Sequence, residues 1–124
     1  MGFLGYAIKF LVPSTQNVSR RISPARFNQR VRMQQRVMTN VYGGTTTTHG
    51  TGTYTGKRGG LVKERVAMVE SFADRKTFQK ERRTAFEAAG VMARAYGQES
   101  IGVETSTPRG RKLYFVGQKA GMRR

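Results

Sequence analysis

A segment rich in glycine and threonine, followed by an apolar-rich run, constrains the fold of this chain most. It extends from Gly43 to Phe72 and reads GGTTTTHGTGTYTGKRGGLVKERVAMVESF. β-Branched residues favour the extended backbone of a strand, and the glycine-rich stretch 56–60 favours a chain reversal. The segment therefore predicts a β-hairpin with arms over residues 45–55 and 61–72.

One strand and one helix are predicted before this hairpin. Residues 6–12 alternate, so that Tyr6, Ile8, Phe10 and Val12 share one apolar face. A proline follows this strand and ends it, because its ring nitrogen cannot donate to a sheet ladder. Ser23 and Pro24 are typical of a helix start, as a hydroxyl N-cap followed by proline. The glycine pair 43–44 ends that helix.

A second helix and two short strands are predicted after the hairpin. Asp74 is suited to cap the helix, and an apolar stripe that includes Phe78 and Met92 recurs at helical spacing up to Gly97. Residues 101–105 alternate as a strand, and residues 112–116 form a small final strand. The order is strand, helix, strand, strand, helix, strand, with one strand appended.

This order predicts an α+β fold, the ferredoxin-like βαββαβ sandwich. In it an antiparallel sheet carries two helices on one face, and here a small extra C-terminal strand. We expect one domain over 1–117 and a basic tail over 118–124. The uncovered sheet face is open to a ligand or a second subunit, so we expect a homo-oligomer through that face. The predicted core includes Phe10, Val66, Met68, Phe78 and Met92.

Glu70 stands out within the hairpin's second arm, because it falls late in a probable central strand. An unpaired carboxylate is costly to bury. We therefore expect Glu70 to pair with an arginine or with a backbone donor.

Charge is the strongest global property of the chain. Its 23 Lys and Arg residues oppose 7 acidic ones, for a formal net charge of +16. Most of these cations are arginines, whose planar guanidinium can hold two phosphate oxygens at once. The excess favours a polyanionic partner over a merely solubilising surface. A membrane is less favoured, since no apolar run approaches the roughly 20 residues needed to span a bilayer.

Cations near the first helix and at the hairpin tip are the candidate contacts to such a partner. We expect them to meet phosphates, with Tyr6 or Tyr54 stacking on bases if exposed. The predicted anion-binding and nucleic-acid-binding set is Arg20, Arg21, Arg26, Arg30, Arg32, Arg36, Lys57, Arg58 and Tyr54.

The sequence indicates no catalytic residues, metal ligands or cofactor. There is no cysteine, and His49 is the single histidine, within a threonine-rich strand. A Ser–His–acid arrangement would have to use this residue, whose nearest acid in sequence is Glu64. We therefore predict a protein that is not an enzyme.

The hairpin and the start of the last main strand resemble a family of small uncharacterised proteins found in bacteria, phages and plasmids. Members share a GG-T…G-x-G-x-Y/W hairpin, a strand ending near VES, and a GQES-like strand start. The resemblance extends from Tyr6 to Glu104 and implies a fold and a phage or mobile-element setting, with no established activity. The matching positions are Gly43, Gly44, Thr45, Gly50, Gly52, Tyr54, Val69, Glu70, Ser71, Gly97, Gln98 and Glu99.

Together these features predict a non-enzymatic, weakly sequence-selective nucleic-acid-binding protein of phage or mobile-element type. It would act in the cytoplasm of a bacterial host cell or in association with the virion. DNA and RNA are not distinguished. One alternative is a protein that binds or sequesters a small anionic, nucleotide-like ligand at a subunit interface. Another is a basic structural component of a large assembly.

Overall fold

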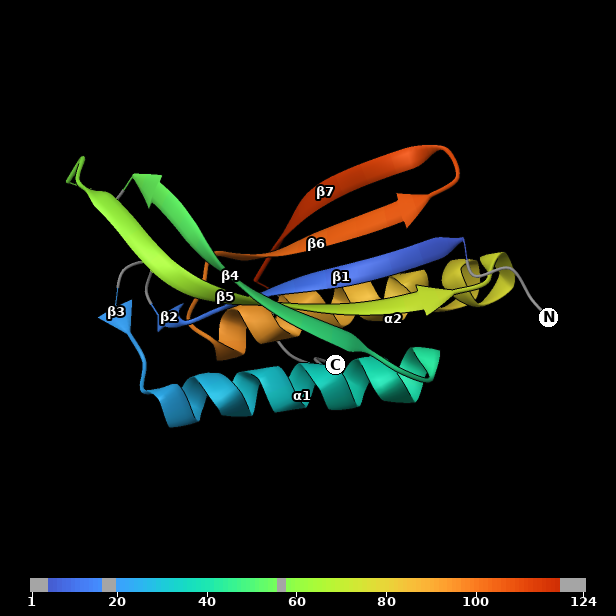
Figure 1. Cartoon of the computed structure of the whole chain (residues 1–124), viewed down its shortest axis with the longest axis horizontal. Helices are drawn as coiled ribbons and strands as arrows, with labels where there is room; N and C mark the ends of the chain where they lie inside the picture. Colours follow the sequence, from blue (N-terminus) through green and yellow to red (C-terminus); the bar gives the residue numbers. More distant parts are fainter. Residues whose placement is uncertain (1–4, 17–19, 56–57, 119–124) are drawn as a thin grey trace.

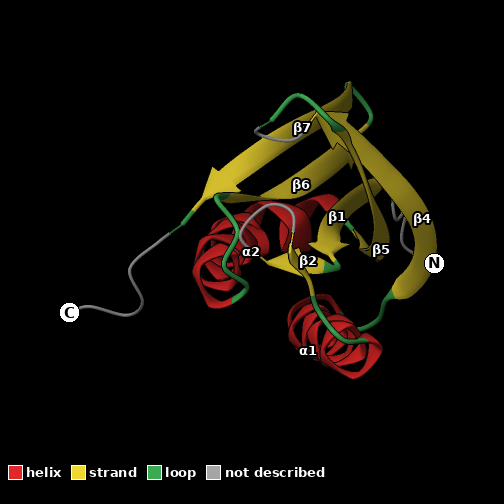
Figure 2. Ribbon diagram, turned by 90° about the vertical axis from the view of Figure 1, so that its left-hand side faces the viewer, coloured by secondary structure: helices red, strands yellow, loops and turns green. Residues whose placement is uncertain are grey.

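A five-stranded antiparallel sheet with two helices on one face forms the structure (Figures 1 and 2). The computed structural model describes residues 5–16, 20–55 and 58–118, apart from the side chain of Tyr54. The predicted ferredoxin-like α+β architecture is confirmed, and the appended strand lies at one edge of the sheet.

The strands follow the order β4-β5-β1-β6-β7 in the sheet. The two crossovers, through α1 and α2, each pass from one strand to a parallel strand with a third strand between them. A separate short ribbon, β2–β3, follows β1. The elements are β1 (Tyr6–Pro13), β2 (Thr15–Gln16), β3 (Arg20–Arg21), α1 (Pro24–Tyr42), β4 (Thr46–Thr55), β5 (Leu61–Ala73), α2 (Arg75–Ala95), β6 (Ser100–Thr107) and β7 (Gly110–Gly117).

The predicted helix ends are confirmed by the capping contacts. The Ser23 hydroxyl accepts a hydrogen bond from the Arg26 backbone N–H at 3.2 Å, and Pro24 opens α1. Gly43 ends this helix with φ of 96°, a left-handed conformation that favours glycine. At α2, the Asp74 carboxylate accepts from the Thr77 N–H at 2.8 Å. This hydrogen bond to the backbone holds the pKa of Asp74 below its usual value.

The core lies between the sheet and the helices, and neighbouring strands fill it with side chains of different size. Strand β1 contributes Ile8, Phe10 and Val12, all fully buried as predicted. Strand β5 contributes its small residues instead, which are Ala67, Val69, Ser71 and Ala73. Small side chains on β5 leave room for the large ones on β1, so that the helices can pack closely on the sheet.

The prediction that Val66 and Met68 are core residues is therefore wrong. Both are half-buried on the face of the sheet away from the helices. Both faces of β5 carry apolar residues, and hydrophobicity alone favoured the face with the larger ones. The remaining predicted core residues, Phe10, Phe78 and Met92, are buried.

The uncovered face of the sheet combines exposed apolar side chains with a charged centre. Phe72, Leu113 and Phe115 are exposed there. Lys9 forms an ion pair with Glu104 at 3.4 Å. The predicted contact between copies of the chain through this face stays a prediction.

Glu70 lies on the same uncovered face, half-buried, and its register partner on β1 is Lys9. Within the described part of the chain, no hydrogen bond or ion pair reaches the Glu70 carboxylate. The expectation that it pairs with an arginine or a backbone donor is therefore wrong. The lysine that faces it is instead paired with Glu104.

Neither described helix combines the length and the apolar composition needed to cross a lipid bilayer. Of the predicted basic tail, 118–124, only Gln118 lies within the described residues. Its backbone N–H donates to the Glu99 carbonyl at 3.3 Å.

The contact between α2 and the sheet can be tested by truncating Phe78. This side chain is 6% exposed, and its ring centroid lies 5.2 Å from that of Tyr6 on β1. We expect Phe78→Ala to lower the free energy of unfolding by about 3–5 kcal/mol, through lost burial and a residual cavity. Denaturant titration would measure this loss.

Val91→Ala provides a control on the same helix. Val91 is exposed, so its truncation should change the free energy of unfolding by no more than about 0.5 kcal/mol. Equal losses in the two variants would contradict the packing of α2 against the sheet.

Candidate functional site

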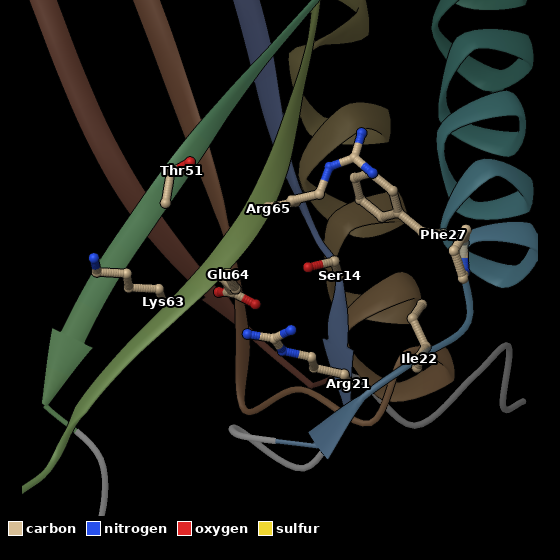
Figure 3. Close-up of a pocket in the computed structure, with 9 residues that line it drawn as sticks. Ser14, Arg21, Ile22, Phe27, Thr51, Lys63, Glu64 and Arg65 are labelled. Atoms are coloured by element: carbon tan, nitrogen blue, oxygen red, sulfur yellow. The ribbon is translucent and has the colours of Figure 1, made fainter.

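A pocket of about 340 Å³ lies where the β4–β5 hairpin extends beyond the rest of the sheet (Figures 1 and 3). The pairing of β1 with β5 ends at Pro13 and Val66, followed by one hydrogen bond from the Ser14 N–H to the Arg65 carbonyl, so residues 61–64 of β5 pair with β4 alone. The ribbon β2–β3 and the start of α1 approach the hairpin at this point. The pocket is lined by Ser14, Arg21, Ile22, Pro24, Phe27, Thr51, Lys63, Glu64 and Arg65.

Glu64 is the acidic residue among the described residues that line this pocket. Its Oε2 atom accepts a hydrogen bond from the Thr15 hydroxyl at 2.6 Å. Burial raises the pKa of this half-buried carboxyl, while the Thr15 hydroxyl and the charge of Arg30 act in the opposite direction. The carboxylate is thus partly withdrawn from water and held by one short hydrogen bond.

The register of the hairpin leaves space beside this carboxylate. Gly52 of β4 lies directly opposite Glu64 of β5. A Cβ atom on Gly52 would lie 3.3 Å from Val66 Cγ2 and 3.9 Å from Glu64 Cγ. An added Cβ would therefore press against Val66 and come into ordinary van der Waals contact with the Glu64 side chain.

Thr15 connects Glu64 to two other parts of the chain. It is 1% exposed, and its carbonyl oxygen accepts from Gln98 Nε2 at 2.5 Å and from Arg30 Nη1 at 2.8 Å. Its hydroxyl oxygen also accepts from Gln98 Nε2, at 3.1 Å, while donating to Glu64. Because the acceptor side of this hydroxyl is occupied by Gln98, its proton is directed to the carboxylate.

Arg30 anchors this arrangement from within the protein. It is buried, and it donates to the carbonyls of Pro13, Thr15 and Tyr96 at 2.8, 2.8 and 3.0 Å. Its guanidinium lies 4.4 Å from the centroid of the Tyr96 ring. Burial lowers the pKa of Arg30 and raises that of Tyr96 to about 12. The prediction that Arg30 contacts phosphates is corrected, because its donors are used inside the protein.

The other residues that line the pocket are apolar or cationic, apart from Ser14 and Thr51. Ile22, Pro24 and Phe27 contribute the apolar surface, and Arg65 lies over the Phe27 ring at 5.4 Å. Arg21 and Lys63 also line the pocket, and Figure 3 shows the Lys63 amine pointing away from Glu64. A ligand in this pocket would therefore meet one negative charge among several positive ones.

Most of the predicted anion-binding residues lie elsewhere. Of those that the structure describes, only Arg21 lines this pocket. Lys57 and the side chain of Tyr54 lie outside the described residues. The members exposed on the surface are Arg20, Arg21, Arg26, Arg32, Arg36 and Arg58.

Sequence reasoning missed Thr15 and gave Glu64 no role in a site. A signal for Glu64 was nonetheless present. With the reversal at 56–60, Thr55 falls opposite Leu61, and Gly52 then falls opposite Glu64. A residue without a side chain therefore faces one of only 7 acidic residues in the chain. Nothing in the sequence indicated that Thr15 and Gln98, 83 residues apart, would meet.

Solved structures that share this fold include two of a phage SAM lyase. The chain matches the enzyme in complex with S-methyl-5'-thioadenosine with a TM-score of 0.66 and 15% identity, over 100% of this chain and 96% of that one. It matches the apo enzyme with a TM-score of 0.64 and 16% identity, over 97% of each chain. At this identity the likeness shows the fold. No protein-family model and no curated protein match the sequence, so the predicted family resemblance stays a prediction.

These neighbours contradict the prediction of a non-enzymatic nucleic-acid-binding protein. Both are enzymes, and one of them holds a small molecule. The expectations that the chain is not an enzyme and that nucleic acid is its main partner are corrected with it. The error has a physical origin, because net charge is a property of the whole surface and does not locate a site. The alternatives, a binder of an anionic nucleotide-like ligand and a structural component, receive no support from these neighbours.

The hydrogen bond from Thr15 to Glu64 predicts a measurable pKa shift. The hydroxyl stabilises the charged carboxylate and so lowers its pKa, against the effect of burial. We expect Thr15→Val, which removes the donor at nearly constant volume, to raise the pKa of Glu64 further. Titration of the carboxyl carbon by NMR would measure it.

Thr15→Ser keeps the hydroxyl and is the matched control. Its Glu64 pKa should stay close to that of the unsubstituted protein. An unchanged pKa in the valine variant would show that the hydroxyl does not influence the carboxylate.

Proposed function

We propose that this protein is a lyase that cleaves S-adenosylmethionine at the Glu64 pocket and releases S-methyl-5'-thioadenosine. Support comes from the likeness of the fold to a phage SAM lyase over the whole chain. A pocket of about 340 Å³ also falls within the range of about 300–1,000 Å³ that is usual for small-molecule sites.

The observation that carries the proposal is the half-buried Glu64 carboxylate in a chain with net charge +16. The substrate has a sulfonium and an ammonium group, both positive, and one carboxylate. A cationic ligand needs a negative partner that is partly shielded from water, since a shielded charge pair is stronger than an exposed one. Glu64 would supply this partner, and the substrate carboxylate would pair with one of the cations that line the same pocket, Arg21, Lys63 or Arg65.

The apolar wall of the pocket suits the bond cleavage itself. The bond between the sulfonium sulfur and the amino-acid side chain breaks, and its electron pair stays on sulfur. The products of this step include a neutral thioether, so the positive charge on sulfur disappears. A surface with little water, such as that of Ile22, Pro24 and Phe27, favours a step that removes charge.

A lyase adds no water, so the carbon that loses sulfur must gain a new bond from within the amino-acid fragment. Two routes conserve atoms and charge. In one, the fragment's own carboxylate attacks the carbon that loses sulfur and closes a ring. In the other, a base removes a proton from the adjacent carbon and a double bond forms. Glu64, whose pKa is raised by burial, is the group in the pocket suited to accept that proton.

Glu64→Gln tests the site and separates the two routes. The protein should convert S-adenosylmethionine to S-methyl-5'-thioadenosine, measured by chromatography with the second product identified by mass. We expect the variant to raise KM by about tenfold, which corresponds to losing about 1.4 kcal/mol of charge pairing. A kcat that is largely kept indicates ring closure, whereas a loss of about a hundredfold or more indicates that Glu64 is the base.

Glu87→Gln removes a carboxylate from the exposed surface of α2 and is the control. Its kinetic constants should match those of the unsubstituted protein. The proposal fails if the unsubstituted protein forms no thioadenosine product, or if both variants behave alike.

The pH dependence follows from the raised pKa of Glu64. We expect kcat/KM to fall as the pH drops through this pKa, because the protonated carboxyl cannot pair with a cation. In Thr15→Val this acid limb should move to higher pH. We further propose that the protein works in the cytoplasm of a bacterial host cell.

A further inference from the structure

A second pocket, of about 250 Å³, lies between α2 and the β6–β7 hairpin. It is separate from the Glu64 pocket. Ser106, next to its lining residue Thr107, pairs with Ala7 near the start of β1, whereas the Glu64 pocket begins at Ser14, after the end of β1 (Figure 1). The described residues that line it are Phe78, Arg82, Thr105, Thr107, Arg109, Gly110, Arg111, Lys112 and Tyr114.

The charge of this pocket is entirely positive. Arg82, Arg109, Arg111 and Lys112 line it, and none of the described lining residues is acidic. The last three are exposed at its rim, whereas Arg82 is half-buried. Like charges gathered without a counter-ion repel one another, and an anion bound between them would relieve this repulsion.

Arg82 is held in a fixed position by two aromatic rings. Its guanidinium carbon lies 5.0 Å from the centroid of Phe86 and 5.5 Å from that of Tyr114. Nη2 donates to the Tyr114 hydroxyl at 2.9 Å. The buried Nε has no hydrogen-bond acceptor among the described residues. Because this Nε is buried, an oxyanion in the pocket would contact the guanidinium through its Nη groups, whose position the two rings fix.

We propose that this pocket binds a phosphate group, either inorganic phosphate or a small phosphate monoester. Arg82 provides the fixed contact from the inner wall. The rim cations Arg109, Arg111 and Lys112 neutralise the remaining charge. The volume accommodates a phosphate with a small organic group. This site is independent of the lyase reaction proposed for the Glu64 pocket.

The test is an NMR titration of the full chain, labelled with nitrogen-15, with sodium phosphate at constant ionic strength. We expect saturable shifts of amides near Arg82 and in the β6–β7 hairpin. Arg82→Gln should weaken binding by about tenfold, the size expected for loss of a hydrogen bond to a charged group. Arg94→Gln, which removes an exposed charge from the last turn of the same helix, should change the affinity by less than about twofold.

Two further arms complete the experiment. If Arg82→Gln does not give a folded amide spectrum, the rim variant Arg111→Gln/Lys112→Gln takes its place, with the same expected loss. Titration with glycerol phosphate beside inorganic phosphate distinguishes the two occupants, since the tighter ligand identifies the source. Shifts that spread over the whole basic surface without saturation, or equal affinity in the Arg82 and Arg94 variants, would overturn the proposal.

Discussion

The buried guanidinium of Arg30 is the interaction on which the rest of the site depends. A cation removed from water needs acceptors for its donors, and here backbone carbonyls of Pro13, Thr15 and Tyr96 provide them. These carbonyls belong to the end of β1, to β2 and to the end of α2. One side chain of α1 therefore joins the segment from the end of β1 to β2 with the end of α2, which is far away in the sequence. This contact fixes the position of Thr15, whose hydroxyl donates to Glu64.

From this anchor a chain of hydrogen bonds leads to the carboxylate. Arg30 and Gln98 fix the Thr15 carbonyl, and the Thr15 hydroxyl then donates to Glu64. Two opposing effects act on the carboxyl. Burial favours its neutral form, while the hydroxyl and the nearby guanidinium favour its charged form. Burial thus raises the affinity of Glu64 for a proton, while the two donors favour the charge that would pair with a cation. The proposed lyase reaction uses the charge by either route, and it uses the basicity only if the carbon fragment forms a double bond.

The structure shows that the cations responsible for the large positive charge lie in several different environments. The Arg30 side chain is buried in the protein, and the Arg82 guanidinium lies close to two aromatic rings. Arg21, Lys63 and Arg65 line the same pocket as Glu64. Summed charge predicted one extended anionic partner, yet the structure distributes these cations among separate environments. Several of these cations line two separate small pockets. Glu64 lies in the first, whereas the described residues that line the second include no acid.

The sequence by itself determined the main elements and their order, but not the short β2–β3 ribbon, whose residues it indicated to be a loop. Alternation in β1, the Ser23, Gly43 and Asp74 caps, and the hairpin around residues 56–60 are local properties, because each depends on neighbouring residues. With four main strands and two crossover helices, they sufficed for the ferredoxin-like architecture. Tertiary structure decided which face of β5 meets the helices, since both faces are apolar and only the large residues of β1 settle the choice. It also decided the site. Thr15 contacts Glu64, 49 residues away in the sequence, and Gln98, 83 residues away. Such contacts depend on tertiary packing, and no local sequence pattern predicts them.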